Sequence, residues 1–363
     1  MRGQSHDMVQ LLTPDGQRVH NDDFDFSGTT DDLVGYLRDM ILARRFDAEA
    51  TALQRHGELG LWPPLLGQEA AQVGSAHAVR DQDVVFPSYR EHAVAMVLGV
   101  PVSNFLGLFR GTDGGNWDNL DKFKNYQIVI GCQPLHATGY AMGLQLDGVV
   151  GPDAEDPAAV IVYHGDGAAS QGDVNEAYVF AASYNAPVVF FCQNNQWAIS
   201  EPIALQSRIP LYERARGFGF PGVQVDGNDV LAVKAVTDWA MDRARGGEGP
   251  TFIEAFTYRL GAHTTSDDPT KYRTSSEEEE WKGRDPIARL TTYLKAEGVI
   301  DDDWLAQMDE DARQFGEDVR ATIPTLEPVT MDGLFQTVYA EPSVALESQR
   351  REYLDYAAAG EDA

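Results

Sequence analysis

Cysteine, basic residues and long apolar runs are all scarce in this chain of 363 residues. Its 28 Lys and Arg stand against 57 Asp and Glu, which gives a formal net charge of −29. A field of that sign repels the phosphate backbone of nucleic acids and the surface of anionic membranes. No apolar run approaches the ~20 residues that span a bilayer. We therefore expect no nucleic-acid partner and no membrane association.

The two cysteines, Cys132 and Cys192, are too few for a disulfide framework and indicate a protein of the reducing cytoplasm. The eight histidines form no H-x-x-x-H pair and there is no C-x-x-C pair, which argues against a zinc site. Residues 1–7 lack the apolar core of a secretory signal, and Met8 is an alternative start to Met1. Hydrophobic residues at 43% exclude a disordered chain.

What the chain does contain is organised in three parts. Residues 1–28 are polar and rich in Asp, and we expect a mobile or draped N-terminal extension. Residues 29–325 alternate between helical and strand-like patterns and are expected to form one α/β domain. Residues 326–363 are charged and helical in pattern, which predicts a helical C-terminal tail.

The middle of the chain alternates buried strands with helices. Short apolar runs such as AVIVY and PVVFFC are separated by longer helical patterns. This alternation is typical of βαβ units, in which helices cover both faces of a parallel sheet. The predicted strands cover residues 159–163, 187–192 and 251–256, the predicted helices cover 172–184 and 230–245, and a long polar loop covers 261–276.

The most informative stretch, YHGDGAASQGD at residues 163–173, lies where a predicted strand ends and a helix begins. Gly165 and Gly167 let the backbone approach a ligand closely, and free N–H groups at the helix start favour a phosphate. One interpretation is a dinucleotide site, but Ser170 stands where that fingerprint has its third glycine. The next strand also lacks the terminal acidic residue that the fingerprint requires. The dinucleotide interpretation therefore fits poorly.

The alternative interpretation uses polar residues at two strand ends. Asp166 follows one predicted strand and Asn195 follows the next, and consecutive strands of βαβ units are often neighbours. Mg²⁺ prefers hard oxygen ligands and completes its shell with phosphate, water or backbone carbonyl oxygens. Each residue alone is more simply a turn or cap residue, but the pair together favours a magnesium diphosphate site.

The spacing GDG-x26-NN resembles the thiamin diphosphate motif of thiamin-dependent enzymes. Over residues 30–340 the chain resembles the α subunit of the E1 component of 2-oxo acid dehydrogenase complexes. The resemblance implies the thiamin diphosphate-binding fold, a parallel sheet with helices on both faces. The segments that carry it, in family order, are residues 67–74, 87–92, 164–177, 192–200, 225–233 and 258–274.

The resemblance also implies which residues bind the two cofactors, thiamin diphosphate and Mg²⁺. Asp166, Asn195 and the backbone carbonyl of Trp197 are the implied metal ligands. The backbone N–H groups of Gly167 and Ala168 are implied to bind the diphosphate.

Five more positions follow from the same resemblance. Tyr89 and Arg90 are implied to reach the diphosphate, and Arg suits a bidentate phosphate contact. Ile128 and Ile130 are implied to line the middle of the cofactor, although by themselves they would be core aliphatics. His263 is implied to complete the diphosphate site near the reacting centre and is the catalytic candidate, although by itself it would be a loop histidine.

Only one half of a thiamin active site is recognisable in this chain. In the family, a Glu that assists cofactor activation belongs to the β subunit, so the resemblance implies an α2β2 heterotetramer. The implied activity is oxidative decarboxylation of a 2-oxo acid, with transfer of the acyl group to the lipoyl arm of an E2 acyltransferase. A more remote alternative is a non-catalytic interaction subunit.

The substrate is a branched-chain 2-oxo acid in the interpretation we favour, with pyruvate as the alternative, because both classes of enzyme resemble residues 225–230 and 263–273. Pro63 departs from the pyruvate pattern and Ser88 departs from the branched-chain pattern, both near the expected substrate approach. Thr264 stands where eukaryotic relatives carry a phosphorylated serine, and the sequence alone implies no dedicated kinase.

Overall fold

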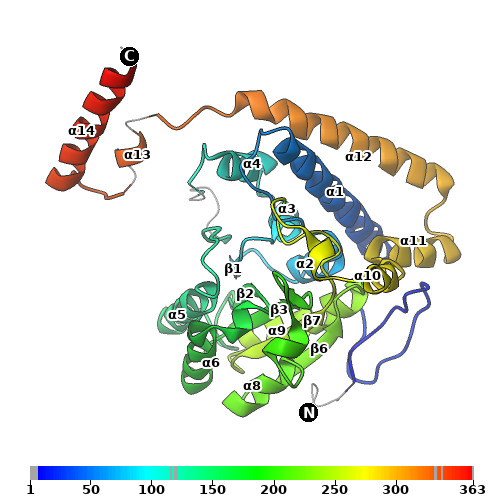
Figure 1. The fold of residues 1–363 in the computed structure, drawn as a ribbon. Helices are drawn as coiled ribbons and strands as arrows, with labels where there is room; N and C mark the ends of the chain where they lie inside the picture. Colours follow the sequence, from blue (N-terminus) through cyan, green and yellow to red (C-terminus); the bar gives the residue numbers. More distant parts are fainter. Residues whose placement is uncertain (1–6, 115–116, 118–121, 331–332, 337, 362–363) are drawn as a thin grey trace.

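The fold is built around a five-stranded parallel sheet with the strand order β1-β2-β3-β7-β6 (Figure 1). A computed structural model describes residues 7–114, 117, 122–330, 333–336 and 338–361. The strands are β1 (Val84–Phe86), β2 (Val160–Gly165), β3 (Val188–Asn194), β6 (Gly222–Asp226) and β7 (Thr251–Phe256). The predicted parallel sheet is therefore confirmed, while the edge strands β1 and β6 were not predicted.

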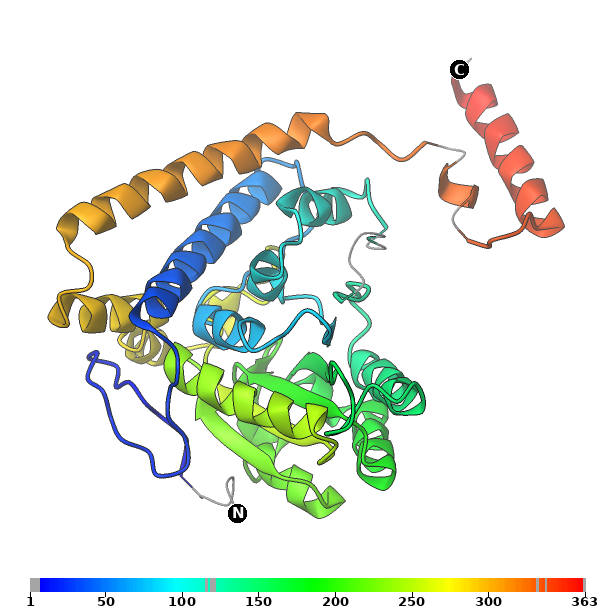
Figure 2. The ribbon, with the colours of Figure 1, turned by 180° about the vertical axis from the view of Figure 1, so that it is seen from behind.

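Alternate side chains of the central strands enter two separate cores. Ile161 and Tyr163 of β2 belong to the core beneath α1, α2 and α9, whereas Val160 and Val162 belong to the core beneath α5, α6 and α8. The period of two is that of a strand buried on both faces. Helix α9 crosses one face of the sheet in the reverse view, while α5 and α6 lie on the other side (Figure 2).

The helices of the α/β domain are α1 (Thr30–Arg55), α2 (Glu69–Ala76), α3 (His92–Val97), α4 (Val102–Arg110), α5 (Gln133–Leu146), α6 (Gly172–Tyr184), α7 (Ile203–Gln206), α8 (Tyr212–Phe218), α9 (Val230–Arg245), α10 (Ser275–Lys282), α11 (Pro286–Ala296) and α12 (Asp302–Thr322). Short 3-10 turns are η1 (Ala168–Ser170), η2 (Pro269–Lys271) and η3 (Ile323–Thr325), and β4 (Trp197–Ala198) pairs with β5 (Glu201–Pro202) in a small antiparallel hairpin. The helices predicted over residues 172–184 and 230–245 are confirmed with these bounds.

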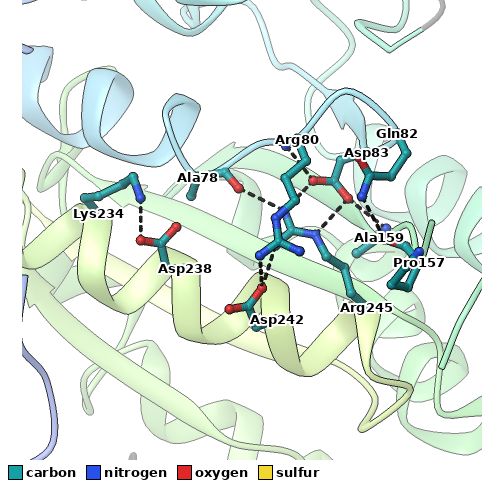
Figure 3. Close-up of polar contacts among 10 residues, drawn as sticks. All are labelled: Ala78, Arg80, Gln82, Asp83, Pro157, Ala159, Lys234, Asp238, Asp242 and Arg245. Carbon is teal, nitrogen blue, oxygen red and sulfur yellow. Dashed lines mark hydrogen bonds and ion pairs between the residues drawn. The ribbon is translucent and has the colours of Figure 1, made fainter. Parts of the chain in front are cut away.

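A buried ion pair fixes the edge strand β1 to the C-terminal end of α9 (Figure 3). Asp83 is fully buried and accepts hydrogen bonds from the backbone N–H groups of Arg80 and Ala159, at 2.7 and 3.0 Å. Both its oxygens also contact the guanidinium of Arg245, which in turn donates to the carbonyl of Ala78 at 2.9 Å. Each buried polar group of Asp83 therefore has a partner, as burial requires.

The N-terminal segment, from residue 7 onward, is packed against the edge of the sheet. Val9 pairs with Val225 of β6, and the N–H groups of Leu11 and Leu12 both donate to Asp229 at 2.6 Å. Asp229 also caps α9 through its other oxygen, so one buried carboxylate fixes two segments. The described part of this extension is draped over the domain, and Met1 lies outside the described residues.

The C-terminal tail leaves the domain after η3 and carries α13 (Gly333–Gln336) and α14 (Val344–Glu361). Both helices stand apart from the domain in the two views (Figures 1 and 2). Tyr339, Val344 and Tyr356 are exposed on this tail. Across the described ranges, no helix combines the length and the apolar character that crossing a membrane requires.

Candidate functional site

A cavity of about 210 Å³ opens at the carboxyl edge of the sheet, where β2 and β3 end side by side. Gly165 at the end of β2 pairs with Gln193 of β3, so the residues that follow, Asp166 and Asn195, lie at the same edge. Both line the cavity. The pairing of β2 with β3 therefore brings Asp166 and Asn195 to the same edge of the sheet.

The Gly-Asp-Gly turn is shaped by close packing on one side and by space on the other. A Cβ on Gly167 would lie 2.8 Å from the Cβ of Ala198, so only glycine fits there. A Cβ on Gly165 would meet no atom within 4 Å, and this residue lines the cavity. The first contact brings the β4–β5 hairpin against the turn, and the second leaves room for a ligand beside the backbone.

Asp166 is a nearly fully buried carboxylate, with 2% of its surface exposed. Burial raises its pKa, and this is opposed first by the bond from Gln206 Nε2 to Oδ2, at 3.0 Å, and also by the charge of Arg259. Asn195 lies beside it and donates through Nδ2 to Gln68 Oε1 at 3.1 Å. A single acidic oxygen ligand and a neutral amide thus face the cavity together.

Two buried arginines line the same cavity. Arg90 donates to the carbonyl of His263 at 3.0 Å, and Arg259 donates to the carbonyls of Trp197 and Ile199 at 2.8 and 2.7 Å. Among the described residues, neither guanidinium forms an ion pair with a carboxylate. Burial and the nearby positive charge of Arg90 lower the pKa of Arg259 to about 10. Two buried cations without a salt-bridge partner among the described residues make this a favourable place for an anion.

His263 lies between these two arginines. Its Nδ1 is 3.4 Å from a nitrogen of Arg90 and 3.4 Å from a nitrogen of Arg259. Guanidinium nitrogens only donate, so Nδ1 accepts and the ring proton is assigned to Nε2. Burial and the charges of both arginines lower the pKa of His263 to about 3, and the ring is neutral at pH 7. Its loop is fixed by the N–H of His263, which donates to Asp267 at 2.8 Å.

Most residues predicted for the cofactor come together around the cavity. Tyr89, Arg90, Ile130, Asp166, Gly167, Ala168, Asn195, Trp197 and His263 all line it. Ile128 does not line it, and its side chain is 55% exposed. The Trp197 carbonyl, predicted as a metal ligand, accepts a hydrogen bond from Arg259, which occupies one of its two lone pairs.

Arg259 and Ile199 are among the cavity residues that were not predicted from the sequence. Arg259 lies four positions before His263 in the quoted segment 258–274, but nothing in the sequence shows that its side chain is buried. Ile199 lines the cavity with a φ of +58°, a left-handed conformation that is unusual for a β-branched residue. Backbone strain of this kind leaves no signal in the residue type.

Among the described residues, no three His, Cys, Asp or Glu side chains gather in a group that could hold a metal. The predicted magnesium site contains one carboxylate, one amide and one backbone carbonyl. Its fit to a metal therefore depends on a ligand that brings further oxygens, as a diphosphate does.

Comparison with known proteins supports the resemblance that the motifs carry. Residues 37–322 match the family model described as "Dehydrogenase E1 component". The chain belongs to the dehydrogenase E1 component family. It is 42% identical over 352 residues to the 3-methyl-2-oxobutanoate dehydrogenase subunit alpha of Mycobacterium tuberculosis, covering 95% of this chain and 92% of that relative.

Pyruvate enzymes are also among the relatives of this E1 chain. It is 38% identical over 353 residues to the pyruvate dehydrogenase E1 component subunit alpha of Staphylococcus epidermidis, covering 96% of this chain and 92% of that relative. The subunit of the same name from Staphylococcus aureus has the same identity and coverage. The predicted family and the predicted fold class are thus confirmed.

Proposed function

We propose that this E1 chain is the α subunit of a thiamin diphosphate-dependent 2-oxo acid dehydrogenase that acts on branched-chain 2-oxo acids. The single observation that carries the proposal is the cavity in which two buried, unpaired arginines face one buried carboxylate. A diphosphate with Mg²⁺ would complement that pattern, because Arg90 and Arg259 would hold the anionic oxygens and Asp166 would hold the metal. The family membership and the 42% identical relative agree with it.

The residues around the cavity fit both cofactors. Arg90 and Arg259 would hold the diphosphate, together with Tyr89 and the N–H groups of Gly167 and Ala168. Asp166, Asn195 and the carbonyl of Trp197 would hold Mg²⁺. The open space beside Gly165 supports this fit, because any side chain there would extend into free volume.

When bound, thiamin diphosphate supplies a carbon nucleophile and an electron sink for decarboxylation. The residues of this chain orient and shield that chemistry. His263, whose pKa is lowered by burial and by the charges of the two arginines, is neutral and would offer Nε2–H as a donor in the cavity. Burial of Arg90 and Arg259 reduces the dielectric screening of their charges, which strengthens their attraction to an anion.

We propose a β subunit as the second half of the active site, in an α2β2 heterotetramer, and a lipoylated E2 acyltransferase as the acceptor of the acyl group. The exposed apolar side chains of Val129 and Ile130 beside the cavity support a protein partner there. Both cysteines are free thiols, which agrees with a reducing, cytoplasmic location.

The substrate is tested by co-expressing the chain with its β subunit and comparing decarboxylation of 3-methyl-2-oxobutanoate and pyruvate. We expect a higher kcat/KM for the branched-chain acid. Pyruvate is the second candidate, because relatives named for it are 38% identical over nearly the whole chain. A preference for pyruvate would replace the substrate assignment and leave the E1 assignment intact. The absence of decarboxylation of any 2-oxo acid by the assembly would favour the non-catalytic interaction subunit.

A further inference from the structure

A side chain from outside the sheet holds the carboxylate of Asp166. Gln206 is the last residue of α7, and its Nε2 donates to Oδ2 of Asp166 at 3.0 Å. The same amide group donates to the carbonyl of Glu201 at 3.2 Å, so its orientation is fixed from two directions. Asp166 is 2% exposed, and water therefore has little access to replace this bond.

The segment that carries Gln206 also carries a predicted metal ligand. Helix α7 directly follows the β4–β5 hairpin, which contains Trp197, and the N–H of Ile203 donates back to the carbonyl of Gln196 at 3.0 Å. The hairpin and α7 thus form one unit. Gln206 connects this unit to Asp166, which lies on the turn after β2.

Arg214 of α8 makes a second link between the same two segments. Its Nη1 donates to the carbonyl of Ala169 at 2.9 Å, just after the Gly-Asp-Gly turn. Its Nη2 donates to the backbone carbonyl of Gln206 at 3.5 Å. The close packing of Gly167 on Ala198 adds an apolar contact between them. The turn and the hairpin are therefore held at a fixed separation.

We propose that Gln206 is a positioning residue for the metal site. By holding Oδ2 of Asp166 it would fix the rotation of the carboxylate, and through the hairpin it would keep the Trp197 carbonyl in place, so that both groups could hold Mg²⁺. Partners of this kind orient metal ligands, and their loss typically weakens metal affinity roughly 10- to 100-fold. The inference rests on the proposed function, because Mg²⁺ and thiamin diphosphate are the ligands it serves.

The test uses the full chain co-expressed with its β subunit and Mn²⁺ as a spectroscopic substitute for Mg²⁺. Gln206→Leu removes the amide at similar size. We expect roughly ten-fold or greater weakening of Mn²⁺ binding, measured by electron paramagnetic resonance in the presence of thiamin diphosphate. Saturating metal should restore kcat, because the change acts on metal affinity alone. The thermal unfolding midpoint without metal should stay at the wild-type value.

Gln82→Leu is the matched control, because the Gln82 amide donates to the carbonyl of Pro157 at 3.2 Å and does not line the cavity. Its metal affinity should equal that of the wild type. Gln206→Asn, one methylene shorter, should show the same metal defect as Gln206→Leu and serves if the leucine variant does not fold.

Asp166→Ala, measured in parallel, separates two kinds of failure. If Asp166→Ala loses Mn²⁺ binding while both Gln206 variants bind like the wild type, the role of Gln206 is overturned and the proposed metal site stands. If Asp166→Ala also binds like the wild type, the metal site itself is wrong, and with it the cofactor part of the proposed function.

Discussion

Two buried arginines of this protein, Arg245 and Arg259, have opposite electrostatic surroundings. Arg245 contacts Asp83 and Asp242, and these charges raise its pKa against the effect of burial (Figure 3). Among the described residues, Arg259 contacts carbonyl and hydroxyl oxygens and the ring of His263 but no carboxylate, and burial and the charge of Arg90 lower its pKa to about 10. Arg245 therefore has carboxylate partners within the folded chain, whereas Arg259 has none among the described residues. Burial alone therefore does not mark a site; Arg259 is a candidate because it also lacks a salt-bridge partner in the described part of the chain and lines the cavity.

The largest expected effect is on stability, from Arg245→Met. This change leaves Asp83 buried without its charge partner, and we expect the free energy of unfolding to fall by about 3–5 kcal/mol. Urea unfolding followed by tryptophan fluorescence measures it. Arg80→Met is the control, since its ion pair with Asp242 is exposed and contributes about 0–1 kcal/mol. Equal losses in the two variants would contradict the structural role of Arg245.

The matching change in the site is Arg259→Met, which should affect binding more than stability. No carboxylate is left unpaired, but the diphosphate loses a charged donor, which is worth about 1.5–3 kcal/mol. We expect affinity for thiamin diphosphate at fixed Mg²⁺ to fall about 10- to 100-fold by calorimetry. Arg259→Lys keeps the charge and should lose less. If Arg259→Met destabilises the fold as much as Arg245→Met, the distinction between a structural Arg245 and a ligand-binding Arg259 is wrong.

The elements at the centre of the sheet could be predicted from the sequence, whereas the edge strands could not. The helices at residues 172–184 and 230–245 were predictable because the patterns before and after them change period sharply. The edge strands β1 and β6 were not, because one has three residues and the other is only partly buried, so neither stands out from its flanks.

The site likewise contains residues that could be predicted from the sequence and residues that could not. Asp166 and Asn195 were predictable because each follows a strand, and parallel strands end at one edge. Gln206 was not, because its contact with Asp166 depends on the path of a hairpin and a four-residue helix. Ile128 was predicted to lie at the cofactor from the resemblance, yet it does not line the cavity and is 55% exposed, since a loop path is set by tertiary contacts that the residue type does not encode.

His263 provides a smaller, pH-dependent effect. In the unfolded chain a histidine binds a proton below about pH 6.5, whereas folded His263 stays neutral down to about pH 3. The unfolded state therefore binds more protons in that window, and stability falls as the pH drops through it. Between about pH 7 and about pH 5, the His263→Gln variant should therefore lose less stability than the wild type. Buried His92 and His164 are unchanged and contribute equally to both slopes. Identical slopes would contradict the lowered pKa.

The pKa of His263 should also report whether an anion binds to Arg90 and Arg259. An anion bound by Arg90 and Arg259 neutralises the charges that lower the pKa of His263, so binding should raise that pKa. Titration of the His263 ring by NMR, with and without inorganic diphosphate, measures the shift. An unchanged His263 pKa on addition of diphosphate would contradict anion binding by the two arginines.

The smallest expected effect concerns Ile199, which has a φ of +58° and whose carbonyl accepts a hydrogen bond from Arg259 at 2.7 Å. A left-handed conformation costs a residue with a Cβ about 1–2 kcal/mol, and glycine loses about 0.5–1 kcal/mol of extra backbone entropy on folding. Ile199→Gly should therefore stabilise the fold by several tenths of a kcal/mol up to about 1 kcal/mol, because the side chain is 55% exposed and little burial is lost.

Ile209→Gly is the control for this change, since Ile209 is 49% exposed and its φ is negative, so the glycine should destabilise. Thermal unfolding of both variants decides the sign. If Ile199→Gly is the more stable of the two yet binds thiamin diphosphate less well, the strain at Ile199 keeps an apolar side chain in the cavity against the preference of its own backbone. Destabilisation in both variants alike would mean that the hairpin imposes no strain there.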